Sequence, residues 1–137
     1  MARTRTLITF FTLATLILSA CADPRDAYVS FAQCLTNSGT KMYGAYWCPH
    51  CARQKELFGP KSFAEINYTE CDPRGAKADP KSCIDHDVKS YPTWIFADGN
   101  RHSGEMTFEE LSAASKCKLP EAENQVVGTS TTLAETK

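Results

Sequence analysis

The chain has 137 residues, of which 42% are hydrophobic and 23% are charged. This length and composition fit one ordinary globular domain with short flanking segments and exclude a second domain of usual size. The formal net charge of −1 gives no indication of nucleic-acid binding, which usually needs a strongly basic surface.

Residues 1–21 are typical of an export signal. Arg3 and Arg5 precede an apolar run of 12 residues, from Leu7 to Leu18, and small residues follow. The run is too short to span a bilayer as a helix, which needs about 20 residues. An ordinary N-terminal helix of the domain is the alternative interpretation.

The end of this signal, Leu18-Ser19-Ala20-Cys21, resembles a bacterial lipobox, in which the cysteine becomes the lipid-carrying first residue of the mature protein. We therefore expect lipidation of Cys21 and an extracytoplasmic domain, in the periplasm or at the cell surface, held at the membrane by its lipid anchor. The alternative is cleavage after Ala22, because Ala20-Cys21-Ala22 is an A-x-A site that would release a secreted protein.

Besides Cys21, the chain has six cysteines, namely Cys34, Cys48, Cys51, Cys71, Cys83 and Cys117. An even number in a small exported domain is typical of disulfides, which persist in oxidising compartments. Six cysteines can pair in many ways, so the count alone does not give the connectivity.

The first predicted elements of the domain are a helix, a strand and a second helix. Asp23 and Pro24 form a helix start, and apolar residues follow at helical spacing up to Asn37. Aromatic and small residues at 41–47 suit a buried strand. A helix is then expected over residues 49–58, where a Gly-Pro stop signal follows.

The second half of the domain is predicted to contain three more strands and two helices. Residues 64–71 alternate apolar and polar side chains, as a strand does, and Asp79-Pro80 starts a short helix. Residues 93–97 and 100–104 are predicted to form a hairpin around an Asp-Gly turn.

The last helix has the clearest start signal in the chain. Thr107 and Glu110 form a capping box, Met106 and Leu111 are placed as a hydrophobic staple, and the helix is expected to end near Lys116. Residues 118–137 are rich in Pro, Thr, Ser and Glu and are predicted to form a disordered tail. The domain is thus expected over residues 22–117, as an α/β fold with a small mixed four-stranded sheet flanked by helices and an N-terminal helix.

The motif Cys48-Pro49-His50-Cys51 falls at the junction between a predicted strand and a predicted helix. The Cys48 sulfur would therefore lie at the positive end of the helix, beside unpaired N–H groups that favour a thiolate. Pro49 suits the first helical turn, and His50, when protonated, adds a second positive field. Because a stabilised thiolate makes the disulfide a stronger oxidant, the motif predicts a catalyst that oxidises thiols.

The chemistry expected of Cys48 and Cys51 is thiol–disulfide exchange with protein substrates, without a cofactor. A substrate thiolate attacks the Cys48 sulfur, which we expect to be exposed, and Cys51 is the more buried resolving partner. The same steps in reverse would reduce or isomerise a substrate disulfide.

The main alternative interpretation of Cys-x-x-Cys is half of a zinc site. The chain has no second Cys-x-x-Cys and no His pair at ligand spacing, so we predict no metal site. Two rivals stay open on the sequence: a copper or zinc chaperone that uses Cys48, His50 and Cys51, and a lipoprotein module without catalytic activity.

The motif Trp47-Cys48-Pro49-His50-Cys51, together with Tyr91-Pro92-Thr93, resembles the thioredoxin superfamily, and its four central residues are like those of DsbA-type oxidants. The likeness covers about residues 26–117. It is strongest to the thioredoxin-like domain fused to, or paired with, bacterial vitamin K epoxide reductase homologues. Residues 41–47 and 91–94 look like the sequences of that group. The resemblance implies a protein disulfide oxidoreductase that is reoxidised by a membrane quinone reductase of that kind. A reductase of the same fold, acting on particular exported proteins, is the alternative.

The resemblance also implies roles for single residues. Pro92 would be cis and face the active-site cysteines, and Tyr91 would offer backbone hydrogen bonds to an extended substrate segment. On the sequence itself, Trp47 and Trp94 could each lie in the core or at the rim of the site, and we expect Trp47 at the rim, in contact with substrate, and Trp94 in the core. Cys71 and Cys83 would form a structural disulfide, whereas pairing of Cys34 with Cys117 stays open because their helices could lie on opposite faces of the sheet.

The chain departs from this family in two respects. Many relatives carry a buried acid six residues before the first active-site cysteine, where this chain has Met42, so the sequence assigns no residue to proton handling at Cys51. Glu56 is nearby in sequence but is expected to be solvated on a helix surface. The large helical insertion of DsbA-type oxidants is also missing.

Overall fold

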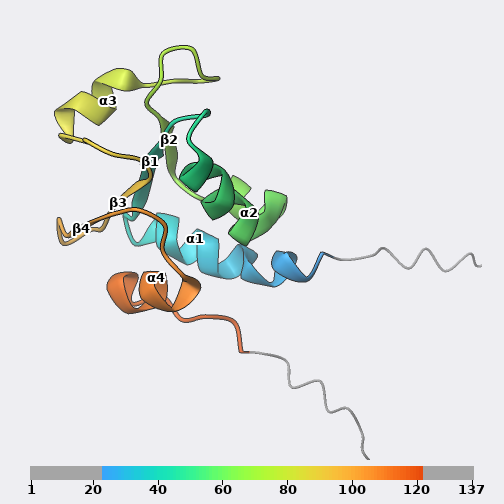
Figure 1. Ribbon diagram of the computed structural model, residues 1–137. Coiled ribbons are helices and arrows are strands. Elements are labelled where there is room, and N and C mark those ends of the chain that lie inside the picture. The colour runs from blue at the N-terminus through green and yellow to red at the C-terminus, as the bar shows by residue number, and fades with distance from the viewer. Residues whose placement is uncertain (1–22, 122–137) are drawn as a thin grey trace, which may run out of the picture.

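The computed structural model describes residues 23–121 (Figure 1). Its elements in chain order are η1 (Pro24–Tyr28), α1 (Val29–Asn37), β1 (Lys41–Gly44), α2 (Pro49–Ala64), β2 (Tyr68–Glu70), α3 (Pro80–Asp85), β3 (Thr93–Ile95), β4 (Arg101–Ser103) and α4 (Phe108–Ser115). The predicted signal peptide with Cys21, and the predicted tail from residue 122 onward, lie outside the described residues.

The strands form one mixed sheet in the order β2-β1-β3-β4. β1 pairs with β2 in parallel and with β3 in antiparallel orientation, and β3 and β4 form the antiparallel hairpin. Helices flank this sheet (Figure 1). The predicted fold class, an α/β thioredoxin-like fold with a small mixed four-stranded sheet, is confirmed.

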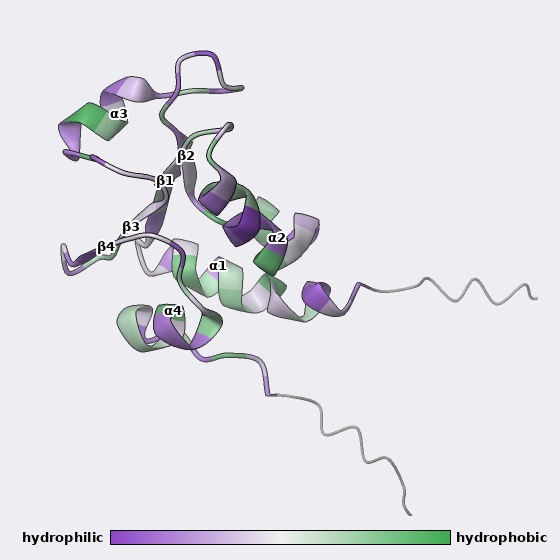
Figure 2. Cartoon of the chain, viewed as in Figure 1, coloured by the Kyte–Doolittle hydropathy of each residue, from purple (hydrophilic) through white to green (hydrophobic). Residues whose placement is uncertain are grey.

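Neighbouring side chains of β1 point to opposite faces of the sheet, as they do in any strand. Met42 lies in the main apolar cluster, to which α1, α2 and α4 contribute. Tyr43 packs on the other face, against Cys71, which follows β2, and against Cys83 of α3. Figure 2 shows hydrophobic residues along α1 and α4 and at the end of α2 near α1. The larger core therefore lies between one face of the sheet and these three helices.

Aromatic rings fill the centre of this core. The ring of Phe58 from α2 lies 5.0 Å from that of Phe108 and 6.3 Å from that of Trp94, measured between centroids, and Phe31 of α1 lies 6.5 Å away on another side. Phe58 and Trp94 are fully buried. Such rings bury a large apolar area, so this contact fixes α2, and with it the start of α2, against the sheet.

The segment after Phe58 differs from its prediction. Gly59 has a left-handed φ of 75° and breaks the helix, but Pro60 begins a second helical segment that continues to Ala64. Proline suits a first helical turn, so the Gly-Pro pair both stops one helix and starts another. The predicted strand over 64–71 is correspondingly shorter and occupies only Tyr68–Glu70.

The two strongest cap signals of the sequence are confirmed. The Thr107 hydroxyl accepts the Glu110 backbone N–H at 3.2 Å, and the Glu110 carboxylate accepts the Thr107 N–H at 2.7 Å. Asp79 caps α3 by accepting the Ser82 N–H at 3.0 Å. Each such cap satisfies helix N–H groups that would otherwise lack a partner.

Two disulfides fasten the fold, one on each face of the sheet. Cys34 of α1 is joined to Cys117 just after α4, and Cys71 after β2 is joined to Cys83 of α3. The first pair can form because α1 and α4 share a face, where Tyr28 stacks on Phe108 with ring centroids 4.0 Å apart. Leu119, beyond the predicted end of the domain, also packs against the main core.

We expect the Cys34–Cys117 disulfide to stabilise the fold more than the Cys71–Cys83 disulfide. The paired residues are 83 and 12 positions apart in the chain. In the chain-entropy model these loops correspond to about 4.5 and about 3 kcal/mol. Urea unfolding of the two double Cys→Ala variants measures the difference, and a larger loss for the Cys71/Cys83 variant would contradict this ranking.

Candidate active site

The dithiol lies where β1 passes into α2. A turn after Gly44 carries the exposed side chains of Tyr46 and Trp47, and Cys48 then forms the N-cap of α2 with an extended backbone. Pro49 occupies the first turn of the helix. Among residues 23–121 the cysteines outside the two disulfides are Cys48 and Cys51, both as thiols.

The Cys48 sulfur is held by backbone groups. It accepts the Cys51 N–H at 3.4 Å, and its thiol donates to the Tyr91 carbonyl oxygen at 3.5 Å. Cys48 is only 4% exposed, less than the sequence analysis expects, because its sulfur turns toward the helix end and the Tyr91 backbone. A helix N-terminus stabilises negative charge, so this position suits a sulfur that must act as a thiolate.

Cys51 lies one helical turn deeper and is 1% exposed. Burial raises the pKa of its thiol from 9.0 to about 12, because a thiolate would lose its hydration there. At neutral pH the Cys51 thiol is therefore protonated. A reaction that uses Cys51 as a nucleophile has to remove this proton first.

Tyr91, Pro92 and Trp47 surround Cys48 from outside α2. The Tyr91–Pro92 peptide bond is cis, and Pro92 is fully buried. The Trp47 indole N–H donates to Asp72 at 2.7 Å, and its ring meets that of Tyr91 edge-on at 6.1 Å. Trp47 is 55% exposed and so lies at the rim of the site, whereas Trp94 is in the core.

His50 belongs to an ionic cluster that the sequence analysis did not find. Its Nδ1 lies 2.7 Å from both the Glu105 carboxylate and the Arg53 guanidinium, and Arg53 also donates to Glu105 at 2.7 Å. Arg53, and after it His50, lower the pKa of Glu105. The positive charge of a protonated His50 imidazole would thus be partly neutralised by the Glu105 carboxylate.

Gln54 holds the segment that carries Glu105 next to the motif. Its buried side-chain amide donates to the Met106 carbonyl at 3.0 Å and accepts the Met106 N–H at 2.7 Å. These bonds tie the segment before α4 to the second turn of α2. Residues 52 to 55 positions apart are brought together, and no local sequence pattern signals this.

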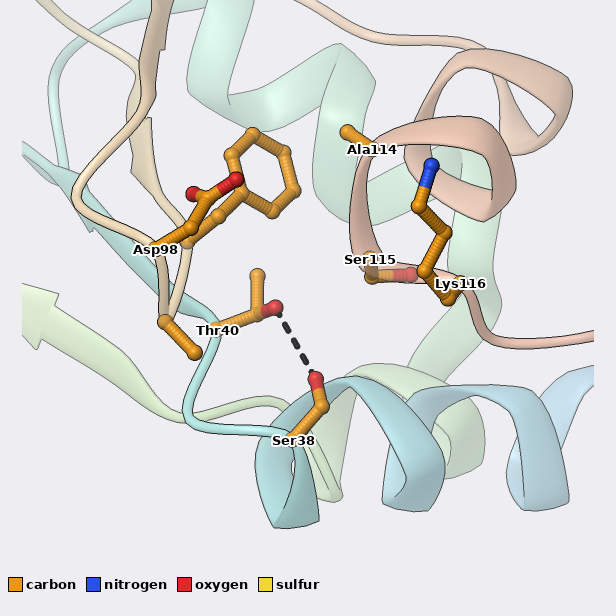
Figure 3. Close-up of a pocket in the computed structure, with 8 residues that line it drawn as sticks. Ser38, Thr40, Asp98, Ala114, Ser115 and Lys116 are labelled. Carbon is orange, nitrogen blue, oxygen red and sulfur yellow. Dashed lines mark hydrogen bonds between the residues drawn. The ribbon is translucent and has the colours of Figure 1, made fainter.

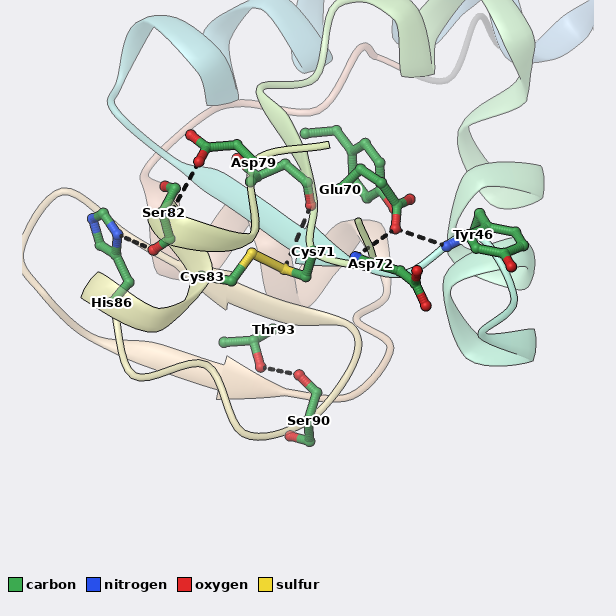
Figure 4. Close-up of a disulfide and its surroundings, with 12 residues drawn as sticks. Tyr46, Glu70, Cys71, Asp72, Asp79, Ser82, Cys83, His86, Ser90 and Thr93 are labelled. Atoms are coloured by element: carbon green, nitrogen blue, oxygen red, sulfur yellow. Dashed lines mark hydrogen bonds between the residues drawn. A yellow bond between two sulfur atoms is a disulfide. The ribbon is translucent and has the colours of Figure 1, made fainter. Parts of the chain in front are cut away.

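A buried carboxylate lies on the other side of the motif. Glu70, at the end of β2, is 5% exposed and accepts the N–H groups of Tyr46 and Asp72 at 3.1 and 3.0 Å, as Figure 4 shows. It also accepts the Tyr68 hydroxyl at 2.8 Å. No motif in the sequence points to this residue, although strand alternation puts Tyr68 and Glu70 on one face.

A surface hollow lies at the far end of the sheet from the dithiol. It is lined by Ser38, Thr40, Asp98 and residues at the end of α4 (Figure 3). Thr40 precedes β1, whereas Cys48 follows β1, so the hollow takes no part in this site.

The described segment also gives two negative observations. Residues 23–121 contain no group of three or more His, Cys, Asp or Glu side chains arranged to hold a metal ion. Of the helices within that range, none has the length and apolar content to cross a bilayer.

The fold and the site define a class: a thioredoxin-like domain whose Cys-x-x-Cys begins a helix and faces a cis-proline. The chain is similar to the thiol-disulfide oxidoreductase LTO1 of Arabidopsis thaliana, with 41% identity over 97 residues. The match covers 69% of this chain and 26% of the relative, so the chain corresponds to about a quarter of that protein. No model of a protein family matches the chain.

We expect alkaline pH to destabilise the protein when the Cys48–Cys51 pair is reduced. Between pH 9.0 and about 12 the unfolded chain loses the Cys51 proton while the folded chain keeps it, so the free energy of unfolding falls as pH rises through this range. Urea unfolding at several alkaline pH values measures the slope. The Cys51→Ala variant should lose less stability over the same range, and parallel curves would contradict the raised pKa.

Proposed function

We propose that this chain is a thiol:disulfide oxidoreductase that works through a Cys48–Cys51 disulfide. The observation that carries the proposal is the position of Cys48 at the N-cap of α2, with Cys51 buried one turn on and the Tyr91 carbonyl 3.5 Å from the Cys48 sulfur. The similarity to a relative named as a thiol-disulfide oxidoreductase supports it.

The reaction exchanges one disulfide for another. A substrate thiolate attacks the Cys48 sulfur of the oxidised protein, the Cys48–Cys51 bond breaks, and Cys51 leaves with the electron pair and takes up a proton. A second thiolate of the substrate then attacks the substrate sulfur of the mixed disulfide. A substrate disulfide forms, and Cys48 is released as a thiolate. The substrate has lost two electrons and the protein has gained them.

We propose that the protein runs in the oxidising direction. The Cys48 sulfur accepts a backbone N–H at the start of a helix, and this arrangement stabilises the reduced thiolate and so raises the oxidising power of the disulfide. Pro49 and His50 occupy the two positions between the cysteines. The alternative is a reductase of the same fold that acts on particular exported proteins.

We further propose an extracytoplasmic protein, anchored through a lipid on Cys21 or, alternatively, secreted. The two further disulfides support an oxidising compartment, where such bonds persist. As the electron acceptor we propose a membrane quinone reductase of the vitamin K epoxide reductase kind, on the sequence resemblance of residues 26–117.

The direction of the reaction is tested by the equilibrium of the Cys48–Cys51 disulfide with glutathione. An oxidant should have a reduction potential well above about −180 mV, whereas a potential near about −270 mV would indicate the reductase. Failure of the two cysteines to form a disulfide, with tight stoichiometric zinc or copper binding by the reduced protein, would overturn the proposed activity in favour of a metal chaperone.

Substrates are tested by trapping in secreting cells. The Cys51→Ala variant cannot form the Cys48–Cys51 disulfide, so its mixed disulfides arise when the Cys48 thiolate attacks a substrate disulfide and displaces one substrate thiolate. Because the variant has no second thiol in the motif to release them, we expect disulfide-linked substrate proteins to accumulate on Cys48. Non-reducing gels followed by mass spectrometry detect them. The matched control is Cys48→Ala, which should trap none, and equal patterns from both variants would count against the assignment of Cys48 as the attacked sulfur.

A further inference from the structure

Glu70 is the one buried acidic residue in the part of the chain that the structure describes. Its Oε1 accepts two backbone N–H groups, and its Oε2 accepts the Tyr68 hydroxyl at 2.8 Å. The loop after β2 closes over it, because a Cβ on Gly75 would lie 2.4 Å from Glu70 Cγ. This carboxylate therefore has access to its surroundings mainly through the Tyr68 hydroxyl.

The Tyr68 hydroxyl lies close to the Cys51 sulfur. Both lie on the side of Gly44 that a side chain would occupy, because a Cβ built on Gly44 would be 2.8 Å from Cys51 Sγ and 3.1 Å from Tyr68 Oη. The sulfur and the hydroxyl are thus no farther apart than these two distances together. Because Gly44 has no side chain, no heavy atom of its own fills the space between them.

The other titratable groups near this pair come from several elements. They are Cys48 and Lys55 of the motif and α2, Asp72 of the loop after β2, and Tyr91 of the segment before β3. Lys55 covers the outer face of the Tyr68 ring, with its Nζ 3.9 Å from the ring centroid. Glu70 is the acid in hydrogen-bond contact with Tyr68.

We propose that Tyr68 and Glu70 carry the proton of Cys51 during disulfide exchange, which deepens the function proposed above and rests on it. When Cys51 attacks, its S–H group turns into the space beside Gly44 to form a hydrogen bond with the Tyr68 oxygen, and its proton passes to that oxygen while the Tyr68 proton passes to Glu70. The Cys51 electron pair then forms the bond to Cys48, and the departing thiolate leaves Cys48. In the opposite step Glu70 returns the proton through Tyr68 to the Cys51 thiolate as it leaves.

The ionisation of the two other groups fits these roles. Burial, and after it the hydrogen bond to Glu70, raises the pKa of Tyr68, so the phenol keeps a proton and acts as a conduit rather than as a stable base. Burial also holds Cys51 protonated at neutral pH. A thiol in this state needs a proton acceptor within the protein, since water reaches little of its surface.

The test measures how fast Cys51 resolves a mixed disulfide. The reduced protein reacts with dithiobis(nitrobenzoate), which places an aromatic thiol on Cys48, and Cys51 then displaces that thiol as a coloured thiolate. We expect Tyr68→Phe and Glu70→Gln to slow this second release about 10²-fold at neutral pH, the lower range of general acid–base effects. The deficit should shrink as pH rises, because hydroxide replaces the relay.

Tyr43→Phe is the matched control, since Tyr43 is a buried tyrosine on the other face of β1 whose hydroxyl has no hydrogen-bond partner among the described residues. It should release the thiolate as fast as the wild type. Equal rates in all four proteins would overturn the relay, and so would a loss in Tyr68→Phe and Glu70→Gln that is the same at every pH, which indicates a structural effect. If the wild type itself formed no Cys48–Cys51 disulfide, the proposed function would fail instead.

Discussion

The hydrogen bond from the Cys51 backbone N–H to the Cys48 sulfur is the interaction on which the site depends. It forms because α2 begins at Pro49 with Cys48 as its N-cap. The contact of the same sulfur with the Tyr91 carbonyl also requires that the helix be held at a fixed angle to β1. The packing of Phe58 against Trp94 and Phe108 supplies that condition. The core of the domain thus helps to hold the Cys48 sulfur against the segment before β3.

Two long-range contacts bring a carboxylate to each side of the motif. Gln54 binds the backbone of Met106 and brings Glu105 to His50, at the exposed side of Cys48. Glu70 lies on the inner side, where it holds the turn before Cys48 through the Tyr46 N–H. Glu70 is buried, whereas His50 and Glu105 are accessible to solvent. The motif is thus flanked by one buried and one partly exposed carboxylate.

The local signals of the sequence predicted most of the fold. The capping box at Thr107 and the cap at Asp79 depend on residues within a few positions of one another, and the structure contains both. The Gly59-Pro60 pair both stops one helical segment and starts another, so the strand that follows is shorter than the alternation over residues 64–71 predicts. For the site, the sequence singled out the motif, Tyr91 and Pro92, but not Glu105, Gln54 or Glu70, whose positions depend on tertiary packing between distant segments.

The Cys34–Cys117 disulfide also determines how the domain responds to a mechanical load. The loop that the bond closes contains the whole sheet, α2, α3 and α4, and of residues 23–121 it leaves outside only Asp23, η1, the first part of α1 and the residues after 117. A force that pulls on the two ends of the described domain would pass from α1 through the sulfur–sulfur bond to residue 117. The strands that hold the dithiol in place would carry none of that tension for as long as the bond is intact.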